Sequence, residues 1–242
     1  MENYPTDFVG KETLEAINTA DKFNYWMFSV IQPYCQGNIL EIGSGIGNIS
    51  SCFLKENASI YLSDIRADYC KSLSQKFSGS TNLLGVELID LADPMFGSRY
   101  NHLCNKFDTV FALNVLEHIE NQNLALQNAS KLLCEKGRLI ILVPAYQKLY
   151  CRFDEELGHY RRYTRKTLLK AIANGGFSPV KNFYFNLAGI AGWLLFGKLL
   201  GRKQIEKGEM NLYNSLVPIF KIADAVTFHK IGLSVICIAQ KN

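Results

Sequence analysis

Residues 39–48 read Ile-Leu-Glu-Ile-Gly-Ser-Gly-Ile-Gly-Asn, and this stretch decides the fold. A hydrophobic strand runs into a turn that carries glycines at positions 43, 45 and 47, and a helix opens at Asn48. Glycine is needed where the backbone takes positive φ or must lie against a ligand. The first turn of the helix then offers unpaired N–H groups and a positive potential. The stretch therefore predicts a ligand-binding turn at the edge of a sheet.

On both sides of this turn, short apolar runs alternate with helix-like segments. The N-terminal 35 residues look helical and precede the first strand. Strands are expected at residues 38–42, 59–63, 83–88, 107–113 and 138–143, and helices at 48–54, 66–77 and 121–134. This alternation is typical of βαβ units, so the sequence predicts an α/β fold with a parallel sheet.

The alternation stops after Pro144. Residues 145–163 are polar, aromatic and charged, and residues 186–227 form an apolar and basic insertion. The remaining expected elements are a helix at 164–174, strands at 180–185 and 233–239, and a helix at 210–220. The segments 145–163 and 186–227 are therefore expected to cover the sheet edge rather than extend the sheet.

The composition is that of an ordinary globular chain. Of 242 residues, 48% are hydrophobic and 20% are charged, which excludes a disordered or collagen-like chain. The seven cysteines are scattered and odd in number, without a CxxC or Cys/His cluster, so neither a disulfide framework nor a metal site is predicted. The N-terminus lacks an apolar leader, and we expect a cytoplasmic protein.

Charge is unevenly distributed along the chain. Residues 1–144 carry 11 Lys and Arg against 16 Asp and Glu, whereas residues 145–242 carry 15 against 6. The basic part could face an anionic partner such as a phosphate-bearing substrate, a membrane or nucleic acid. The alternative is a solvated basic surface without a function.

Acidic and amide side chains end the expected strands. The glycine spacing G-x-G-x-G differs from the G-x-G-x-x-G of dinucleotide folds, and the carboxylate of Glu41 suits a cationic ligand better than a pyrophosphate. Asp64 could accept both hydroxyls of a ribose or could cap the next helix. Asp90 could accept an adenine amino group or belong to a plain polar loop. Residues 107–113 deliver Asn114 to the same sheet edge.

Together these segments resemble the class I S-adenosylmethionine-dependent methyltransferases, over residues 38–144 and the terminal strands. The resemblance implies a Rossmann-like, doubly wound sheet of seven strands in the order 3-2-1-4-5-7-6 with the last strand antiparallel. It also implies N-terminal helices (1–37) and a helical cap insertion within one domain spanning 1–242. The implied cofactor is S-adenosyl-L-methionine and the implied product is S-adenosyl-L-homocysteine.

The resemblance also implies a set of cofactor contacts. The glycine turn would lie beside the methionine part, Asp64 would hold the ribose, and Asp90 would meet the adenine. Tyr25 could touch the cofactor carboxylate, or could simply pack in an aromatic core. The implied cofactor-binding residues are Tyr25, Glu41, Gly43, Ser44, Gly45, Gly47, Asn48, Asp64, Ile65, Asp90, Leu91, Asn114, Val115 and His118.

The segment after the fifth strand carries the catalytic candidates. Residues 154–163 read DEELGHYRRY, a string that resembles one in bacterial methyltransferases linked to cell-surface glycan and lipid genes. An imidazole there could act as a general base, and the arginines could clamp a carboxylate or phosphate. Alternatively, the arginines pair with Asp154 and Glu155 in an ion-paired lid. The candidate catalytic residues are His159, Tyr160, His118, Arg161 and Arg162.

Residues 183–203 are apolar with a basic end. They include Trp193 and are too short and glycine-rich for an obvious membrane span, so a buried cap or an interfacial helix that contacts a membrane peripherally is favoured. Either arrangement suits an acceptor with an apolar tail.

The sequence thus predicts a methyltransferase that acts on a small-molecule or lipid- or glycan-linked acceptor, most naturally on oxygen and alternatively on carbon. An RNA methyltransferase is a rival reading, but no appended RNA-binding module is evident and Asn114 begins no N-P-P-Y-type motif, which argues against nucleic acid. A second rival is a non-catalytic, cofactor-binding subunit associated with a membrane.

Overall fold

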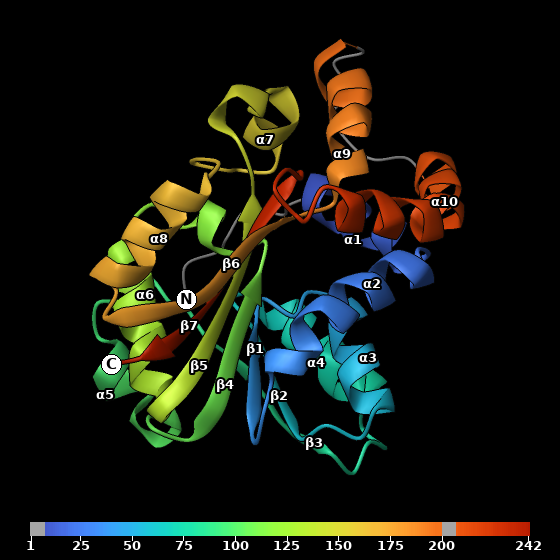
Figure 1. The fold of residues 1–242 in the computed structure, drawn as a ribbon. Coiled ribbons are helices and arrows are strands. Elements are labelled where there is room, and N and C mark those ends of the chain that lie inside the picture. The colour runs from blue at the N-terminus through green and yellow to red at the C-terminus, as the bar shows by residue number, and fades with distance from the viewer. Residues whose placement is uncertain (1–7, 200–206) are drawn as a thin grey trace.

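A computed structural model of the protein describes residues 8–199 and 207–242 (Figure 1). In it, seven strands form one sheet in the order β3-β2-β1-β4-β5-β7-β6. The strands are β1 (Ile39–Ile42), β2 (Ile60–Asp64), β3 (Leu83–Leu88), β4 (Phe107–Leu113), β5 (Leu133–Pro144), β6 (Phe177–Phe185) and β7 (Ser234–Lys241). β7 runs antiparallel to β5 and β6, whereas the other pairs are parallel. The predicted strand order and the antiparallel last strand are confirmed.

The central strands are buried on both faces, as a parallel sheet requires. Successive side chains point to opposite faces, so Leu40 and Ile42 join one core cluster and Ile39 joins the other. Helices α6 (Gln122–Leu132) and α8 (Arg165–Asn174) cover the first face (Figure 1). The opposite face is covered by α2 (Asp21–Ile31), α3 (Asn48–Lys55) and α4 (Ala67–Lys76).

The remaining elements of the core are short or peripheral. They are α1 (Phe8–Asn18), η1 (Gln32–Tyr34), α5 (Phe96–Arg99), η2 (Asn101–Leu103) and η3 (Leu116–His118). The predicted helical segment before the first strand is thus present as α1 and α2.

Two strands begin earlier than the sequence predicts. β5 starts at Leu133 rather than residue 138, because Leu133 pairs with Phe107 across a register shift that precedes Thr109. β6 starts at Phe177 and tolerates Pro179 because it is an edge strand and its register shifts at that residue. The first residues of these two strands do not alternate between apolar and polar side chains, so the sequence did not predict that they belong to a strand.

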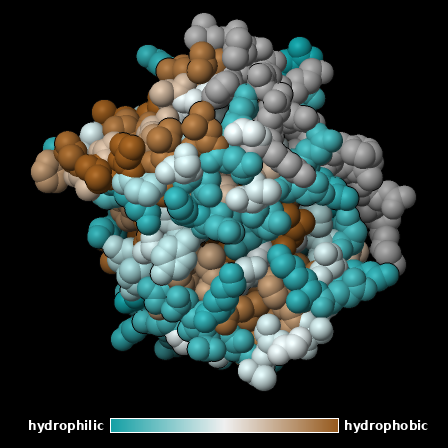
Figure 2. All heavy atoms as spheres, turned by 90° about the vertical axis from the view of Figure 1, so that its right-hand side faces the viewer, coloured by the Kyte–Doolittle hydropathy of each residue, from teal (hydrophilic) through white to brown (hydrophobic). Residues whose placement is uncertain are grey.

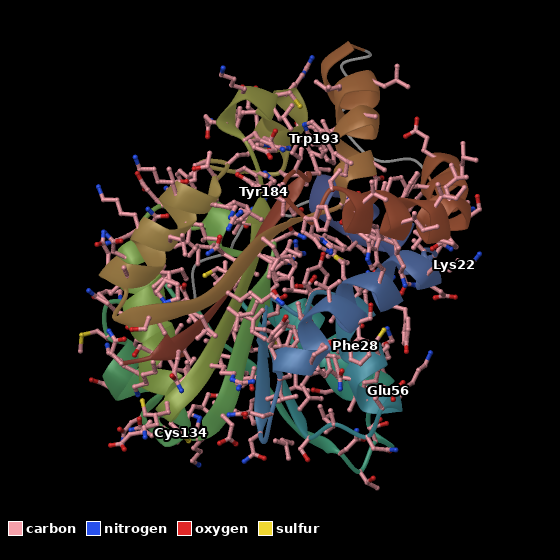
Figure 3. All side chains as sticks on the ribbon, viewed as in Figure 1. Lys22, Phe28, Glu56, Cys134, Tyr184 and Trp193 are labelled. Carbon is pink, nitrogen blue, oxygen red and sulfur yellow. The ribbon has the colours of Figure 1, made fainter. Side chains whose placement is uncertain are left out.

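The two insertions form a cap beyond the edge at which the parallel strands end (Figure 1). The cap consists of η4 (Gln147–Leu149), α7 (Arg152–Glu156), α9 (Leu187–Gly192), the π-helical segment η5 (Trp193–Leu199) and α10 (Lys207–Val226). Trp193 joins the insertions, because its Nε1 donates to the Leu149 carbonyl at 3.0 Å and its ring packs 4.9 Å from that of Phe153. Figure 3 shows Trp193 at this junction.

The segment 183–203 is divided between three elements. Residues 183–185 end β6, and residues 187–199 form α9 and η5, while residues 200–203 lie outside the described part of the chain. Within the described residues, no helix combines the length and apolarity needed to cross a bilayer.

A buried carboxylate fixes α10 to the start of α9. Asp224 accepts the backbone N–H groups of Asn186 and Leu187, both at 2.7 Å. Asn186 has a φ of 67°, and its side chain caps α9 by accepting the N–H of Gly189. One residue of α10 therefore sets the direction in which the cap leaves the sheet.

We expect Asp224→Ala to lower the free energy of unfolding by about 2–3 kcal/mol, because two backbone donors lose a charged acceptor in a buried place. Urea unfolding followed by circular dichroism measures this change. Asp68→Ala is the control, since Asp68 is exposed and forms a surface ion pair with the nearby Arg66. Equal stability of the two variants would contradict the role given to Asp224.

Candidate functional site

The glycine turn after β1 has the backbone that its sequence predicts. Gly43 and Gly47 have φ values of 73° and 80°, which side chains rarely adopt. A Cβ at Gly47 would also lie 2.7 Å from the ring of Phe77, and a Cβ at Gly43 would lie 2.5 Å from Val115. The turn therefore excludes larger residues on both sides and leaves its backbone open to a ligand at Gly43, which is exposed.

Asp64 connects the turn to the end of β2. Its Oδ2 accepts the N–H of Gly45 and its Oδ1 accepts the N–H of Arg66, both at 2.9 Å. Arg66, rather than Asp64, is the N-cap residue of α4. Asp64 therefore contacts the start of this helix through only one of its two bonds, the one to Arg66. Each oxygen retains a second acceptor position. Two ribose hydroxyls can therefore still donate to this carboxylate.

Glu41 is buried in β1 and bonded to Ser50 of α3. Burial raises the pKa of Glu41 to about 7, although the hydrogen bonds from Ser50 and Ser44 act in the opposite direction. A positive ligand nearby would favour the ionised form. The residue is chemically compatible with a cationic ligand, and its contact with a cofactor stays a prediction.

The N-terminal segment closes over the turn through α1. The side chain of Leu14 lies against Gly45, and Asn48 donates from Nδ2 to the Leu14 carbonyl at 3.3 Å. Tyr25 of α2 is half exposed, packs against Phe28, and lines a hollow of about 740 Å³ with side chains of α3 and α10. The side chain that covers the turn is therefore that of Leu14.

The other predicted cofactor residues divide between the edge and the core. Ser44 accepts the N–H of Ser63, and Asp90 accepts that of Ala92 at 2.7 Å in its own loop. Leu91 packs into the main core cluster. Ile65, which is partly exposed, follows Asp64 directly.

The segment after β4 brings a second group of residues to the same edge. Asn114 is exposed with a φ of 54°, and its N–H donates to the Leu142 carbonyl at 2.8 Å. Val115 lies against Gly43 of the turn. η3 follows immediately, so Glu117 and His118 lie within three residues of Val115, which contacts the turn.

Glu117, His118 and His159 form a compact cluster. One ligand-type atom from each lies within 4.8 Å of the others. The rings of His118 and His159 meet edge to face with centroids 4.6 Å apart. Glu117 is fully buried, and neither carboxylate oxygen has a hydrogen-bond partner. Burial raises the pKa of Glu117 to about 8.

His159 is oriented from behind by a buried carboxylate. Its Nδ1 lies 2.8 Å from Oδ1 of Asp154, which also accepts Nε of Arg162 at 2.7 Å. Burial acts to raise the pKa of Asp154, but the bonds from His159 and Arg162 prevail and lower it. A charged Asp154 holds the proton on Nδ1 and leaves Nε2 of His159 free for chemistry.

The two arginines of the loop play different parts. Arg162 is buried between Asp154, the Ala145 carbonyl and the face of Trp193, 4.1 Å from its ring centroid. It is a structural cation, as in the ion-paired-lid interpretation, and is not placed to clamp a substrate. Arg161 is partly exposed and donates to the Glu120 carbonyl at 2.8 Å.

Tyr160 is exposed, and its backbone N–H donates to the Glu117 carbonyl at 2.8 Å. This bond fixes the loop of residues 154–163 to η3. Of the predicted catalytic residues, His118 and His159 therefore belong to the cluster with Glu117, and Tyr160 is bonded to the Glu117 backbone. The sequence patterns did not single out Glu117, or the orienting role of Asp154 in the DEELGHYRRY string. In the sequence, Glu117 stands directly before His118, whereas Asp154 precedes His159 by five positions.

Residues 40–139 match the family model described as a methyltransferase domain. Lovastatin diketide synthase from Aspergillus terreus is 27% identical over 113 residues, and a hybrid PKS-NRPS synthetase from Talaromyces variabilis is 29% identical over 133 residues. The aligned parts cover 44% and 52% of this chain but 4% and 3% of those proteins. The chain thus spans only a small part of the curated relatives that it matches.

Solved structures of several activities share the fold. A SAM-dependent methyltransferase from Archaeoglobus fulgidus aligns with a TM-score of 0.55 and 16% identity, over 90% of this chain and 94% of that one. The CurJ carbon methyltransferase aligns at 0.58 and 15%, over 93% and 55%. The cyclase SpnF aligns at 0.59 and 15%, over 91% and 80%. The fold alone therefore does not specify the reaction.

Residues 40–139 are therefore similar to a methyltransferase domain, and the sheet has the Rossmann-like fold of S-adenosylmethionine-dependent methyltransferases. The glycine turn, Asp64 and the buried acid Glu41 are compatible with that cofactor on chemical grounds.

We expect Asp64→Ala to weaken S-adenosylhomocysteine binding by about 1–3 kcal/mol, because ribose hydroxyls and the Gly45 N–H lose their acceptor. Isothermal titration calorimetry measures the loss. Asp108→Ala serves as a control, since its carboxylate accepts the N–H of Asn38 at the opposite end of β1. Unchanged affinity in a folded Asp64→Ala protein would refute the ribose placement.

Proposed function

We propose that the protein transfers a methyl group from S-adenosylmethionine to an oxygen of a small-molecule or lipid- or glycan-linked acceptor. The observation that carries the proposal is the position of the Glu117–His118–His159 cluster. It follows the sheet edge directly after Val115, which touches the glycine turn. A cofactor in the cradle and an acceptor at the cluster would be neighbours.

The cluster has the chemistry that an oxygen acceptor needs. The cofactor supplies an electrophilic methyl group, so the protein must align the acceptor and help to remove its proton. The Asp154–His159 pair presents Nε2 at this place, and His118 forms the exposed side of the cluster. Tyr160 lies beside it on the surface. We propose that His118, His159 and Tyr160 act on the acceptor. Arg162 instead stabilises the loop that carries His159, through its ion pair with Asp154.

Methyl transfer to carbon is the second candidate. The sequence relatives are polyketide-type synthases, and one structural neighbour is named as a carbon methyltransferase. Deprotonation at the same cluster would serve an acidic carbon equally well. The products distinguish the two reactions, because transfer gives a methoxy group in one case and a C-methyl group in the other.

We expect S-adenosylmethionine labelled with ¹³C in its methyl group to yield a methoxy signal when the protein is incubated with lipid and glycan extracts and analysed by NMR. A C-methyl signal would establish the second candidate instead. Transfer to added RNA would support the rival assignment to RNA. Cofactor binding without transfer to any acceptor would support a non-catalytic subunit.

In the same assay, we expect His159→Ala to lower turnover by about 10²–10⁴-fold while S-adenosylhomocysteine affinity is retained, because the cluster loses its oriented imidazole. His102→Ala is the matched control, since His102 is an exposed histidine that also pairs with a carboxylate, Glu87, at 2.9 Å. Full activity of His159→Ala would exclude His159 from the reaction.

An acceptor with a lipid tail fits the surface of the cap. α10 exposes Leu212, Ile219, Ile222 and Val226, whose spacing places them on one face of the helix. Figure 2 shows apolar surface gathered on a projecting part of the side that carries α10. Trp193 faces inward, so we propose that a peripheral membrane contact expected of residues 183–203 is made chiefly by α10.

Lysines accompany this apolar face. Lys221 lies within the helix beside Ile222, and Lys230 is exposed just after it. Apolar side chains flanked by lysine favour an anionic bilayer. This location would bring a membrane-embedded acceptor to the cap side of the sheet.

We expect the protein to sediment with anionic liposomes at low salt and Ile222→Glu to reduce the bound fraction severalfold. Val180→Glu is the matched control, because Val180 of β6 and Ile222 are both 64% exposed. Equal loss in the two variants, or no binding of the native protein, would contradict this contact.

A further inference from the structure

We propose that Glu117, His118 and His159 bind a divalent transition-metal cation through one carboxylate and two imidazoles. Sequence spacing did not predict this site, because its ligands come from η3 and from the loop 41 residues later. Their ligand atoms nevertheless lie within 4.8 Å of one another. The proposal concerns the binding of the metal ion. Any role of the metal ion in the reaction rests on the proposed function.

The state of Glu117 is the first support. Its side chain is completely buried, yet both oxygens lack a hydrogen-bond partner. A buried carboxylate without partners is costly, and buried charges are normally paired or coordinate a metal. Arg162, whose charge acts on Glu117, is bonded through Nε to Asp154. A cation between Glu117 and the imidazoles would satisfy the carboxylate.

The surroundings of His159 are the second and independent support. A histidine that ligates a metal usually donates its other ring N–H to a carboxylate, which fixes the tautomer and orients the ring. His159 has that partner in Asp154, at 2.8 Å, and its carbonyl accepts the hydroxyl of Tyr150 at 2.7 Å. The ring is therefore held with Nε2 directed away from Asp154.

The geometry requires only a small adjustment. Two ligand atoms bonded to one ion at about 2.1 Å can be no more than about 4.2 Å apart. His118 can make up the difference by rotation, because its side chain is the exposed member of the three. The Glu117 backbone is fixed by the N–H of Tyr160, so η3 and the loop keep their mutual position.

Three protein ligands leave at least one coordination position open. One carboxylate and two histidines with open positions are a common arrangement for divalent zinc, iron and related ions. The open side faces His118 and solvent, where the acceptor would approach. An acceptor hydroxyl bound there would lose its proton at a lower pH, because a divalent ion lowers the pKa of a bound oxygen.

The test uses Co²⁺ as a spectroscopic probe with the full-length native protein, stripped with a chelator and kept reduced. We expect one Co²⁺ per chain, with visible d–d absorption and without the intense near-ultraviolet band of cobalt–thiolate bonds. The absence of that band separates this site from the seven free cysteines. Zn²⁺ should displace the Co²⁺ and abolish the absorption.

Variants locate the site. His118→Ala and Glu117→Gln should each weaken Co²⁺ binding roughly tenfold or more, and Asp154→Asn should weaken it about 10–100-fold through the orientation of His159. His118 is exposed, so its variant keeps the core intact even if the buried variants fold poorly. His102→Ala removes an exposed histidine paired with Glu87 and should leave binding unchanged.

Absence of stoichiometric binding by the native protein would overturn the proposal, as would full affinity in His118→Ala. Because absorption is measured without cofactor or acceptor, these results are separate from those of the methyl-transfer assay. A protein that binds Co²⁺ at this site but transfers no methyl group would refute the proposed function and retain the metal site.

Discussion

Burial of the sheet on both faces is the constraint on which the rest of the structure depends. Helices cover each face, so the interior strands have no solvent-exposed face that could present reactive side chains to a ligand. Because β1, β2 and β4 are parallel, their carboxyl ends meet at one edge. The candidate functional groups, from Asp64 to His159, lie at or beyond that edge.

The edge is divided between two kinds of buried carboxylate. Asp64 and Glu41 are hydrogen-bonded to the turn and to α3, and we propose that they shape a cradle for the positively charged cofactor. Asp154 is bonded to His159 and Arg162, whereas Glu117 has no hydrogen-bonding partner. The first pair is bonded to the glycine turn and to α3, and we propose that the second pair organises the chemistry of the acceptor. Arg162 and Trp193 connect this second pair to the cap.

The cap connects the histidine cluster to the apolar face of α10. Trp193 packs one insertion against the other, and Asp224 fixes α10 to the end of β6. As a result, the apolar face of α10 and the histidine cluster belong to one connected unit. An acceptor held at a surface by its tail would therefore reach the cluster from the cap side, which is the physical reason to connect lipid-like acceptors with this site.

The sequence by itself determined the alternation of strands and helices and the glycine turn, because apolar periodicity and glycine spacing are local signals. The strand order was predicted from the resemblance to the class I methyltransferases, and the structure confirms it. It also named His118, His159 and Tyr160, which the structure brings together. Only the tertiary structure decided that Arg162 is structural, that Leu14 covers the turn, and that Glu117 meets two histidines. Each of these contacts is between residues that are far apart in the chain. A local sequence pattern cannot predict which distant side chains will be buried against one another.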